Sequence, residues 1–180
     1  MAILVTTSLR PSQRTRTLCN ELKASCAAFS SFTRGKFSHS YLMEYARAKG
    51  ASRLWVINSR FGGPKLIECF DLRGEEPCAS FLLNHVQLLR EMSIKSPKST
   101  RHRQLVLIPP ESSALQPIFE SIRLATGECE AGRAASGKFT ELHIQPSRGL
   151  VELFLIDSVT KLPCGPALYI KAFRKAGCDL

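Results

Sequence analysis

Short apolar runs alternate with amphipathic stretches along the first half of the chain, a pattern typical of α/β proteins. The apolar runs predict four strands, at Ile3–Thr7, Ala27–Phe32, Arg53–Ser59 and Lys65–Leu72. The third run is almost continuously apolar, which favours a strand covered on both faces. The turn Phe61-Gly62-Gly63-Pro64 separates the last two runs, which therefore form a predicted hairpin.

Two amphipathic stretches between these strands predict helices. Ser12 can cap the first, which runs to about Ser25, and Ser38 can cap the second, His39–Lys49. Gly50 follows the second helix at the usual place for a helix-ending glycine. Residues 79–86 form a further strand candidate, although a helix fits their pattern as well.

The second half of the chain repeats the order strand, Pro/Ser turn, helix. Strands are expected at 104–108, 140–145, 150–158 and 168–173, and a helix at about 114–125 is closed by Gly127. Residues 95–103 are polar, basic and broken by Pro97, which predicts a linker or an exposed loop between the halves. The repeat indicates a duplicated α/β unit, but coincidence explains it nearly as well, because the copies share little sequence identity.

The length and composition of the chain indicate how many domains it forms and where in the cell it is expected. With 180 residues, 44% of them apolar and 22% charged, the chain can build its own core. We expect a single domain over residues 1–180, with an N-terminal half at 1–90 and a C-terminal half at 91–180. No segment approaches the roughly 20 apolar residues of a membrane span, and Met1–Val5 is too short for a signal-peptide core. These features predict a cytoplasmic protein without a membrane partner.

The charge of the chain points to an anionic partner. The formal net charge is +10, and residues 1–90 hold thirteen Lys and Arg against six Asp and Glu, while residues 91–180 hold twelve against nine. Excess positive charge on a compact domain is typical of proteins that bind nucleic acid or another anionic surface. A generally basic, soluble protein is the alternative. We expect the first half to carry more of the anion contact.

Seven basic side chains follow the first three predicted strands. They are Arg10, Arg14 and Arg16 after the first strand, Arg34 and Lys36 after the second, and Arg60 and Lys65 beside the turn after the third. If these strands are parallel, some of their loops share one edge of the sheet, where ligands of open α/β sheets bind. The first three arginines surround a helix N-terminus, whose backbone N–H groups suit a phosphate oxygen.

Three phenylalanines lie beside these charges. An exposed ring at Phe32, Phe37 or Phe61 could stack on an unpaired base. The alternative is that the rings belong to the core. A core position is favoured for Phe32, and the two interpretations are equally balanced for Phe37 and Phe61.

The sequence offers little support for catalysis. Gly132–Phe139 has the spacing of a phosphate-binding loop, but Phe139 stands where that loop needs a hydroxyl, and Glu128-Cys129-Glu130 precedes it in place of a strand. A flexible loop of small residues is the simpler interpretation. The seven cysteines form no Cys-x-x-Cys pair and the four histidines are scattered, so no zinc site is predicted. We therefore expect no enzyme activity, no cofactor, no metal and no small-molecule substrate.

Three segments of the first half resemble the Brix domain family, most closely its short archaeal members and its Imp4 branch. These segments are Leu4–Arg16, with its Thr-Thr-Ser and three arginines, Arg34-Gly35-Lys36, and Leu54–Asn58 with the Gly-Pro turn that follows. The resemblance is strong over residues 3–72 and rests mostly on element order over 80–174.

The resemblance implies a non-enzymatic ribosome biogenesis factor that binds ribosomal RNA precursors and assists their processing and the assembly of a subunit with other assembly proteins. It also implies a fold of two similar α/β halves, mixed sheets with flanking helices, each half like an anticodon-binding domain. By matching positions it indicates Arg10, Arg14, Arg16, Arg34 and Lys36 as RNA-facing residues. An alternative function is a protein-interaction scaffold within a ribonucleoprotein, in which the strand after the Gly-Gly-Pro turn pairs with a partner strand.

Overall fold

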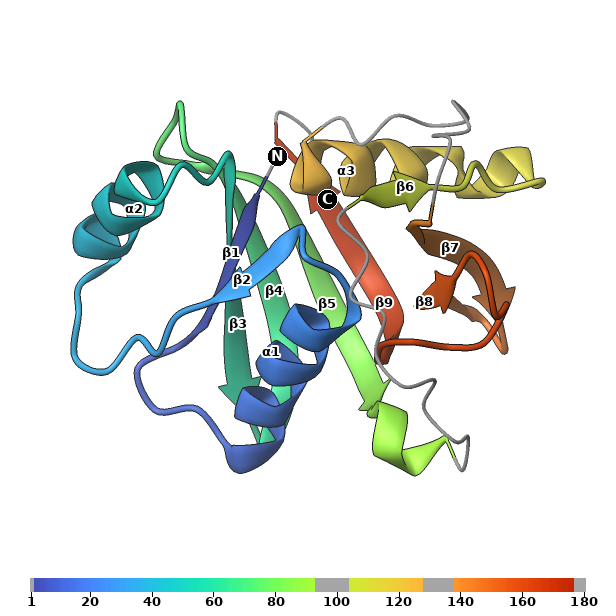
Figure 1. Cartoon of the computed structure of the whole chain (residues 1–180), viewed down its shortest axis with the longest axis horizontal. Helices are drawn as coiled ribbons and strands as arrows, with labels where there is room; N and C mark the ends of the chain where they lie inside the picture. The colour runs from blue at the N-terminus through green and yellow to red at the C-terminus, as the bar shows by residue number, and fades with distance from the viewer. Residues whose placement is uncertain (1, 93–103, 128–137, 177–180) are drawn as a thin grey trace.

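The computed structural model of the chain describes residues 2–92, 104–127 and 138–176. In these residues nine strands form one continuous mixed sheet in the order β2-β1-β3-β4-β5-β9-β8-β7-β6 (Figure 1). The strands are β1 (Ile3–Thr7), β2 (Phe29–Ser31), β3 (Arg53–Arg60), β4 (Gly63–Asp71), β5 (Pro77–Gln87), β6 (Leu105–Leu107), β7 (Thr140–Ser147), β8 (Leu150–Asp157) and β9 (Ala167–Lys175). The helices are α1 (Gln13–Ser25), α2 (His39–Ala48) and α3 (Gln116–Thr126), with short 3₁₀ turns η1 (Leu89–Glu91) and η2 (Ser113–Leu115).

The helix ends lie where the sequence predicts them. The Ser12 hydroxyl accepts a hydrogen bond from the backbone N–H of Thr15, and the Ser38 hydroxyl accepts one from Tyr41, each at 3.2 Å. Gly127 ends α3 in the left-handed conformation, with φ of 74°. These caps satisfy backbone groups that the helices themselves leave unpaired, so the boundaries follow from local chemistry.

The two faces of the sheet are covered by different helices. Val5 and Trp55 belong to the larger core cluster, which also includes α1 and α3, whereas Leu4 and Leu54 pack in a smaller cluster with α2. Alternate side chains of β1 and β3 thus enter different cores, as the apolar run at 54–57 predicts. Residues 79–86, for which the sequence allows a strand or a helix, form part of strand β5.

Strand pairing follows the same order at both ends of the sheet. In the first half β1 is parallel to β3, and β3, β4 and β5 are antiparallel neighbours. In the second half β6 is parallel to β7, and β7, β8 and β9 are antiparallel neighbours. The predicted mixed α/β fold is confirmed, with one sheet in place of separate sheets. The detailed likeness of the halves, their resemblance to anticodon-binding domains and the division near residue 90 stay predictions.

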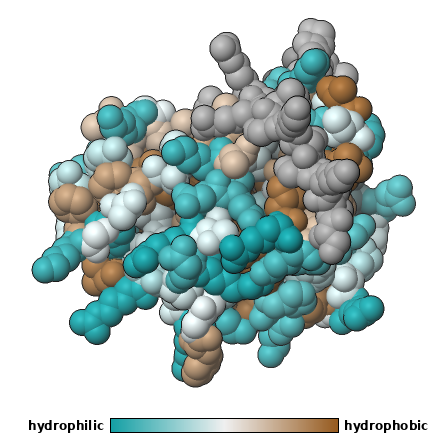
Figure 2. Space-filling view, turned by 60° about the horizontal axis from the view of Figure 1, so that its bottom comes forward, coloured by the Kyte–Doolittle hydropathy of each residue, from teal (hydrophilic) through white to brown (hydrophobic). Residues whose placement is uncertain are grey.

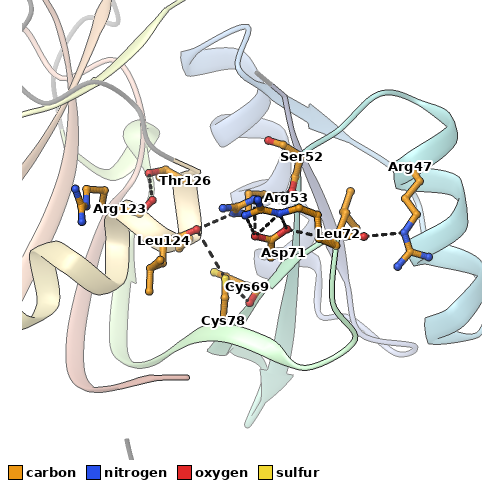
Figure 3. Close-up of polar contacts among 12 residues, drawn as sticks. Arg47, Ser52, Arg53, Cys69, Asp71, Leu72, Cys78, Arg123, Leu124 and Thr126 are labelled. Atoms are coloured by element: carbon orange, nitrogen blue, oxygen red, sulfur yellow. Dashed lines mark hydrogen bonds and ion pairs between the residues drawn. The ribbon is translucent and has the colours of Figure 1, made fainter. Parts of the chain in front are cut away.

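Polar contacts join the two halves where β3 meets the end of α3 (Figure 3). Arg53 donates from Nε to the carbonyl oxygen of Leu124 at 2.7 Å, and the indole nitrogen of Trp55 donates to the carbonyl of Ala125 at 2.8 Å. Both acceptors belong to the last turn of α3, whose carbonyls have no partner within the helix. Asp71, from β4, pairs with Arg53 at 3.2 Å.

One expectation about partner binding is wrong. The strand after the Gly-Gly-Pro turn is β4, and it is hydrogen-bonded to β3 on one side and to β5 on the other. It has no open edge with which to pair a partner strand. The sheet edges in the described part of the chain are β2 and β6, each of only three residues, and such short edges resist strand addition.

Candidate nucleic-acid interface

Three loops meet at one edge of the sheet. Since β2, β1 and β3 are parallel neighbours, their carboxyl ends open together, and the loops β1–α1, β2–α2 and β3–β4 all begin there. The edge lies along the bottom and lower left of Figure 1, and Figure 2 turns the bottom forward to show many hydrophilic side chains on it. The shared edge expected from the sequence is therefore present.

A groove of about 250 Å³ opens between the carboxyl ends of β1 and β2. Its lining includes Thr7, Arg16, Asn20, Thr33 and Gly35. The chain leaves β1 toward α1 on one face and leaves β2 toward α2 on the other, so the groove lies at the point where the connections diverge. Ligands of open α/β sheets bind at such a point, and this lining offers hydroxyl, amide and guanidinium donors suited to an anion.

Arg14 has a structural partner that the sequence does not reveal. Its guanidinium makes two hydrogen bonds to the carboxylate of Glu91, at 2.6 and 2.7 Å, and a third to the carbonyl of Val86 at 2.6 Å. The hydrogen bonds from Arg14 hold the pKa of Glu91 below its usual value. Arg14 therefore fixes α1 to the turn after β5, which leaves it less available to an external phosphate than its neighbours are.

The other basic residues differ in exposure. Arg10, Arg16, Lys36 and Arg60 are exposed, whereas Arg34 and Lys65 are partly buried. The Nε group of Arg34 donates to the carbonyl of Phe37 at 3.1 Å, which closes the β2–α2 turn. Lys65 is the extra residue of a β-bulge, because Asn58 pairs with Leu66 and Ser59 with Pro64. The edge thus presents Arg10, Arg16, Lys36 and Arg60 most openly.

Ser59 ties the hairpin β3–β4 to the start of α1. Its hydroxyl lies 2.7 Å from the Thr15 hydroxyl and accepts a hydrogen bond from the backbone N–H of Ser12 at 3.2 Å. The backbone N–H of Ser59 in turn donates to the Ser8 hydroxyl at 3.4 Å. Sequence reasoning missed this network, although a serine directly after an apolar strand and opposite a Ser/Thr-rich loop was an available signal. The network fixes the β1–α1 loop, the first turn of α1 and the end of β3, which carry Arg10, Arg16 and Arg60, beside one another.

The three phenylalanines at this edge differ in whether they lie in the core or on the surface. Phe32 is partly buried against the smaller core cluster, with its ring 4.1 Å from that of Tyr45, which confirms its core position. Phe37 and Phe61 are exposed by 43% and 89% respectively. Phe37 stacks on Tyr41 at 4.2 Å between ring centroids, and Tyr41 is itself 40% exposed.

The remaining features point away from other kinds of site. Burial raises the pKa of the Cys19 and Cys164 thiols to about 12, so they suit an apolar core rather than nucleophilic chemistry. No metal-binding cluster of His, Cys, Asp or Glu exists in the described residues. No helix among them is long and apolar enough to cross a membrane. The loop at 132–137 lies outside the described residues.

A larger groove, of about 570 Å³, lies on the face of β4, β5 and β9 opposite to the one that packs against α1 and α3. Apolar residues such as Leu66, Leu82 and Ala172 line it together with Glu68 and Arg174. It extends toward the beginning of β5, away from the carboxyl ends of β1 to β3. Its mixed charges give it no preference for a polyanion, so we place the candidate interface at the smaller groove, where Arg16 is the one charged residue among the described residues of the lining.

Comparisons with known proteins bear on this fold. No protein-family model matches the chain. The chain is 34% identical over 111 residues to a probable Brix domain-containing ribosomal biogenesis protein of Aeropyrum pernix, which covers 60% of this chain and 62% of that protein. The crystal structure of a probable ribosomal biogenesis protein from Aeropyrum pernix K1 has a TM-score of 0.80 at 29% identity, covering 94% of each chain. Mil, an archaeal Imp4-like protein, has a TM-score of 0.68 at 24% identity, covering 96% of this chain and 99% of Mil.

The likeness of fold and the likeness of sequence agree with each other. The curled mixed sheet with flanking helices is the fold of Imp4-like proteins. The resemblance to the Brix domain family, predicted from residues 3–72, is confirmed by the sequence relative and by the structure that matches nearly the whole chain.

Proposed function

We propose that this protein is a ribosome biogenesis factor that binds ribosomal RNA precursors through the carboxyl edge of β1, β2 and β3, without enzymatic activity. The observation that carries the proposal is that the exposed residues Arg10, Arg16, Lys36 and Arg60 all follow strands whose carboxyl ends share that edge, where Arg16 also lines a groove with hydrogen-bond donors. The relatives named as ribosomal biogenesis proteins support the biological setting. In that setting its partners are precursor RNA and other assembly proteins.

The charges of the edge favour phosphate contacts over contacts to base edges. Guanidinium groups bind phosphate oxygens in a planar, bidentate manner, and the N-terminus of α1 adds partial positive charge without any acidic residue in its first turn. Contacts of this kind fix the register of the RNA but carry little sequence information. The protein should therefore bind RNA with high salt sensitivity and modest sequence selectivity.

The salt dependence of binding tests the proposal. Each phosphate contact adds roughly 0.7 to 0.9 to the slope of log affinity against log salt concentration, so replacement of Arg16 by glutamine should lower the slope by about one. Arg14→Gln should leave the slope nearly unchanged, because Glu91 and Val86 already bind that guanidinium. Lys171→Gln, at an exposed position of β9, removes one positive charge elsewhere and is the matched control.

Two results would contradict the proposal. One is a slope that is the same for Arg16→Gln and wild type; the other is equal losses for Arg16→Gln and Lys171→Gln, which would mean that net charge alone decides binding. Capture of partners from lysate by this protein, with and without nuclease treatment, distinguishes RNA binding from the alternative function as a protein-interaction scaffold. Partners that survive removal of RNA would favour direct protein contacts.

A further inference from the structure

The turn between β3 and β4 holds an aromatic residue in an unfavourable conformation. Phe61 and Gly62 have φ of 53° and 79°, and the flanking residues Arg60 and Gly63 pair directly. A two-residue turn with both central φ values positive favours Asn-Gly, since a bulky residue is strained in the left-handed region. The Phe61 ring is also 89% exposed, so it contributes little burial to offset the strain.

Neither turn geometry nor core packing accounts for a phenylalanine at this position. Strained residues that the fold does not need tend to mark functional sites. The Arg60 guanidinium carbon lies over the Phe61 ring, 5.0 Å from its centroid. With most of its surface exposed, the ring keeps area open for a planar ligand, next to a cation.

The tip of the hairpin is held at the basic edge. Ser59 anchors its root to Ser12 and Thr15, as described above. A side chain placed on Gly63 would contact the Cδ atom of Arg14 at 4.0 Å, so the tip lies beside the N-terminal turn of α1. Glu91, whose carboxylate lies against that turn, is already bound by Arg14. A ligand stacked on Phe61 therefore has cationic surroundings.

We propose that Phe61, backed by Arg60, is a stacking platform for an unpaired nucleobase, which makes the edge selective for single-stranded RNA over duplex. The proposal rests on the proposed function and adds the kind of RNA that the site accepts. Aromatic rings stack on any base because every base has a π-face, and in a duplex those faces are already covered. An apolar pocket of a protein partner would also accept a ring, but it gains nothing from the surrounding arginines.

The distribution of exposed apolar side chains supports this choice. Of the six large hydrophobic residues exposed in the described part of the chain, four follow the carboxyl ends of β1, β2 and β3: Leu9, Phe37, Tyr41 and Phe61. Basic residues interleave with them, namely Arg10, Lys36 and Arg60. Alternation of rings and cations along one edge is the usual composition of a single-strand binding surface.

The test uses single-stranded RNA of about 12 nucleotides and a duplex of the same length, since single-strand sites span roughly 4–16 nucleotides. Phe61→Asn should weaken single-strand binding about 5- to 100-fold, with an unchanged salt slope and little change for the duplex. Phe61→Trp should keep the affinity and show fluorescence quenching by the single strand. Trp55 is 3% exposed, so wild type should not be quenched and serves as the control.

Stability separates a binding role from a folding defect. Phe61→Asn should raise the unfolding midpoint, because asparagine fits the turn better. Arg148→Asn is the matched control for stability, because Arg148 and Gly149 have φ of 49° and 76° in the turn between β7 and β8. It should raise the unfolding midpoint by a similar amount. Equal single-strand affinity of Phe61→Asn and wild type, or unquenched Phe61→Trp, would overturn the platform and leave the Arg16 result intact. A wild type that binds neither RNA would overturn both proposals.

Discussion

Arg53 donates a hydrogen bond from Nε to the carbonyl oxygen of Leu124, 2.7 Å away and 71 residues later in the chain (Figure 3). The bond places a cation at the C-terminal end of α3, where the helix dipole favours positive charge. The same guanidinium pairs with Asp71 at 3.2 Å, and its side chain is only 8% exposed. Arg53, a residue of the first half, thus offsets the dipole at the end of α3 and holds that helix of the second half in position.

Replacement of Arg53 should be strongly destabilising. Arg53→Met leaves the Leu124 carbonyl without this partner and the half-buried Asp71 carboxylate with Arg73 alone, so we expect a loss of about 2–3 kcal/mol in the free energy of unfolding. Arg73 pairs with the same Asp71 but is 85% exposed, so Arg73→Met should cost less than about 1 kcal/mol. Urea denaturation of both variants measures the difference. Equal losses would mean that burial does not decide the value of these pairs.

The Asp71 carboxylate should make stability depend on acid pH. Hydrogen bonds from Arg73, assisted by the Arg53 charge, lower the pKa of Asp71 from 3.8 to about 2. Because the pKa is lowered in the folded state, the stabilisation is present above pH about 4 and is lost as pH falls toward 2. The advantage of wild type over Asp71→Asn should therefore fall by about 1–2 kcal/mol between pH 5 and pH 2. A difference that stays constant over this range would refute the assignment.

Trp55 should report on both halves of the chain at once. It is the single tryptophan, it is 3% exposed, and its indole nitrogen binds Ala125 of α3. If residues 1–180 unfold as one unit, the fluorescence of Trp55 and the far-ultraviolet circular dichroism should change at the same urea concentration. Two separate transitions would show that the halves unfold independently, in spite of the shared sheet.

Gly165 should tolerate no side chain. A Cβ atom on Gly165 would lie 2.7 Å from Cδ1 of Leu155 and 2.9 Å from Cβ of Ser25, so residues of both halves would have to move. We expect Gly165→Ala to destabilise the protein by about 1–3 kcal/mol. Gly74→Ala is the control, because its Cβ would meet only the Asp71 carbonyl at 4.0 Å, and it should change stability by less than about 0.5 kcal/mol. Thermal unfolding of the two variants compares them.

The elements that the sequence predicts correctly depend on local chemistry. Ser12 and Ser38 cap the beginnings of helices and Gly127 caps the end of one, in each case by hydrogen bonds to backbone groups within four residues. The alternation of apolar side chains in β3 follows from the two-residue period of a strand. The loops at the basic edge could also be foreseen, because a parallel arrangement of the first three strands brings their carboxyl ends together. The three loops therefore lie at the edge of the sheet where the sequence predicts them.

Partners distant in sequence could not be foreseen. The sequence places Arg14 beside a helix N-terminus and so predicts contact with an anion, yet its carboxylate partner within the chain, Glu91, lies 77 positions away. The pairing of β5 with β9 and the open edges of the sheet likewise depend on the order of the strands in the sheet, which no local pattern encodes. The correction to β4 has the same origin, because only the complete strand order shows that it is central.

The pair formed by Arg14 and Glu91 should contribute to stability rather than to RNA affinity. Arg14→Gln removes two hydrogen bonds to the carboxylate and one to the Val86 carbonyl, and Glu91→Gln weakens the first two. Hydrogen bonds to charged groups contribute about 1.5–3 kcal/mol when shielded, and both side chains are about one-third exposed, so we expect each variant to lose about 1 kcal/mol. In a double-mutant cycle the two losses should overlap, because the same contact is removed in both. Additive losses would contradict the pairing of the two side chains, and a loss of RNA affinity in Arg14→Gln as large as in Arg16→Gln would return Arg14 to the set of RNA-contacting residues.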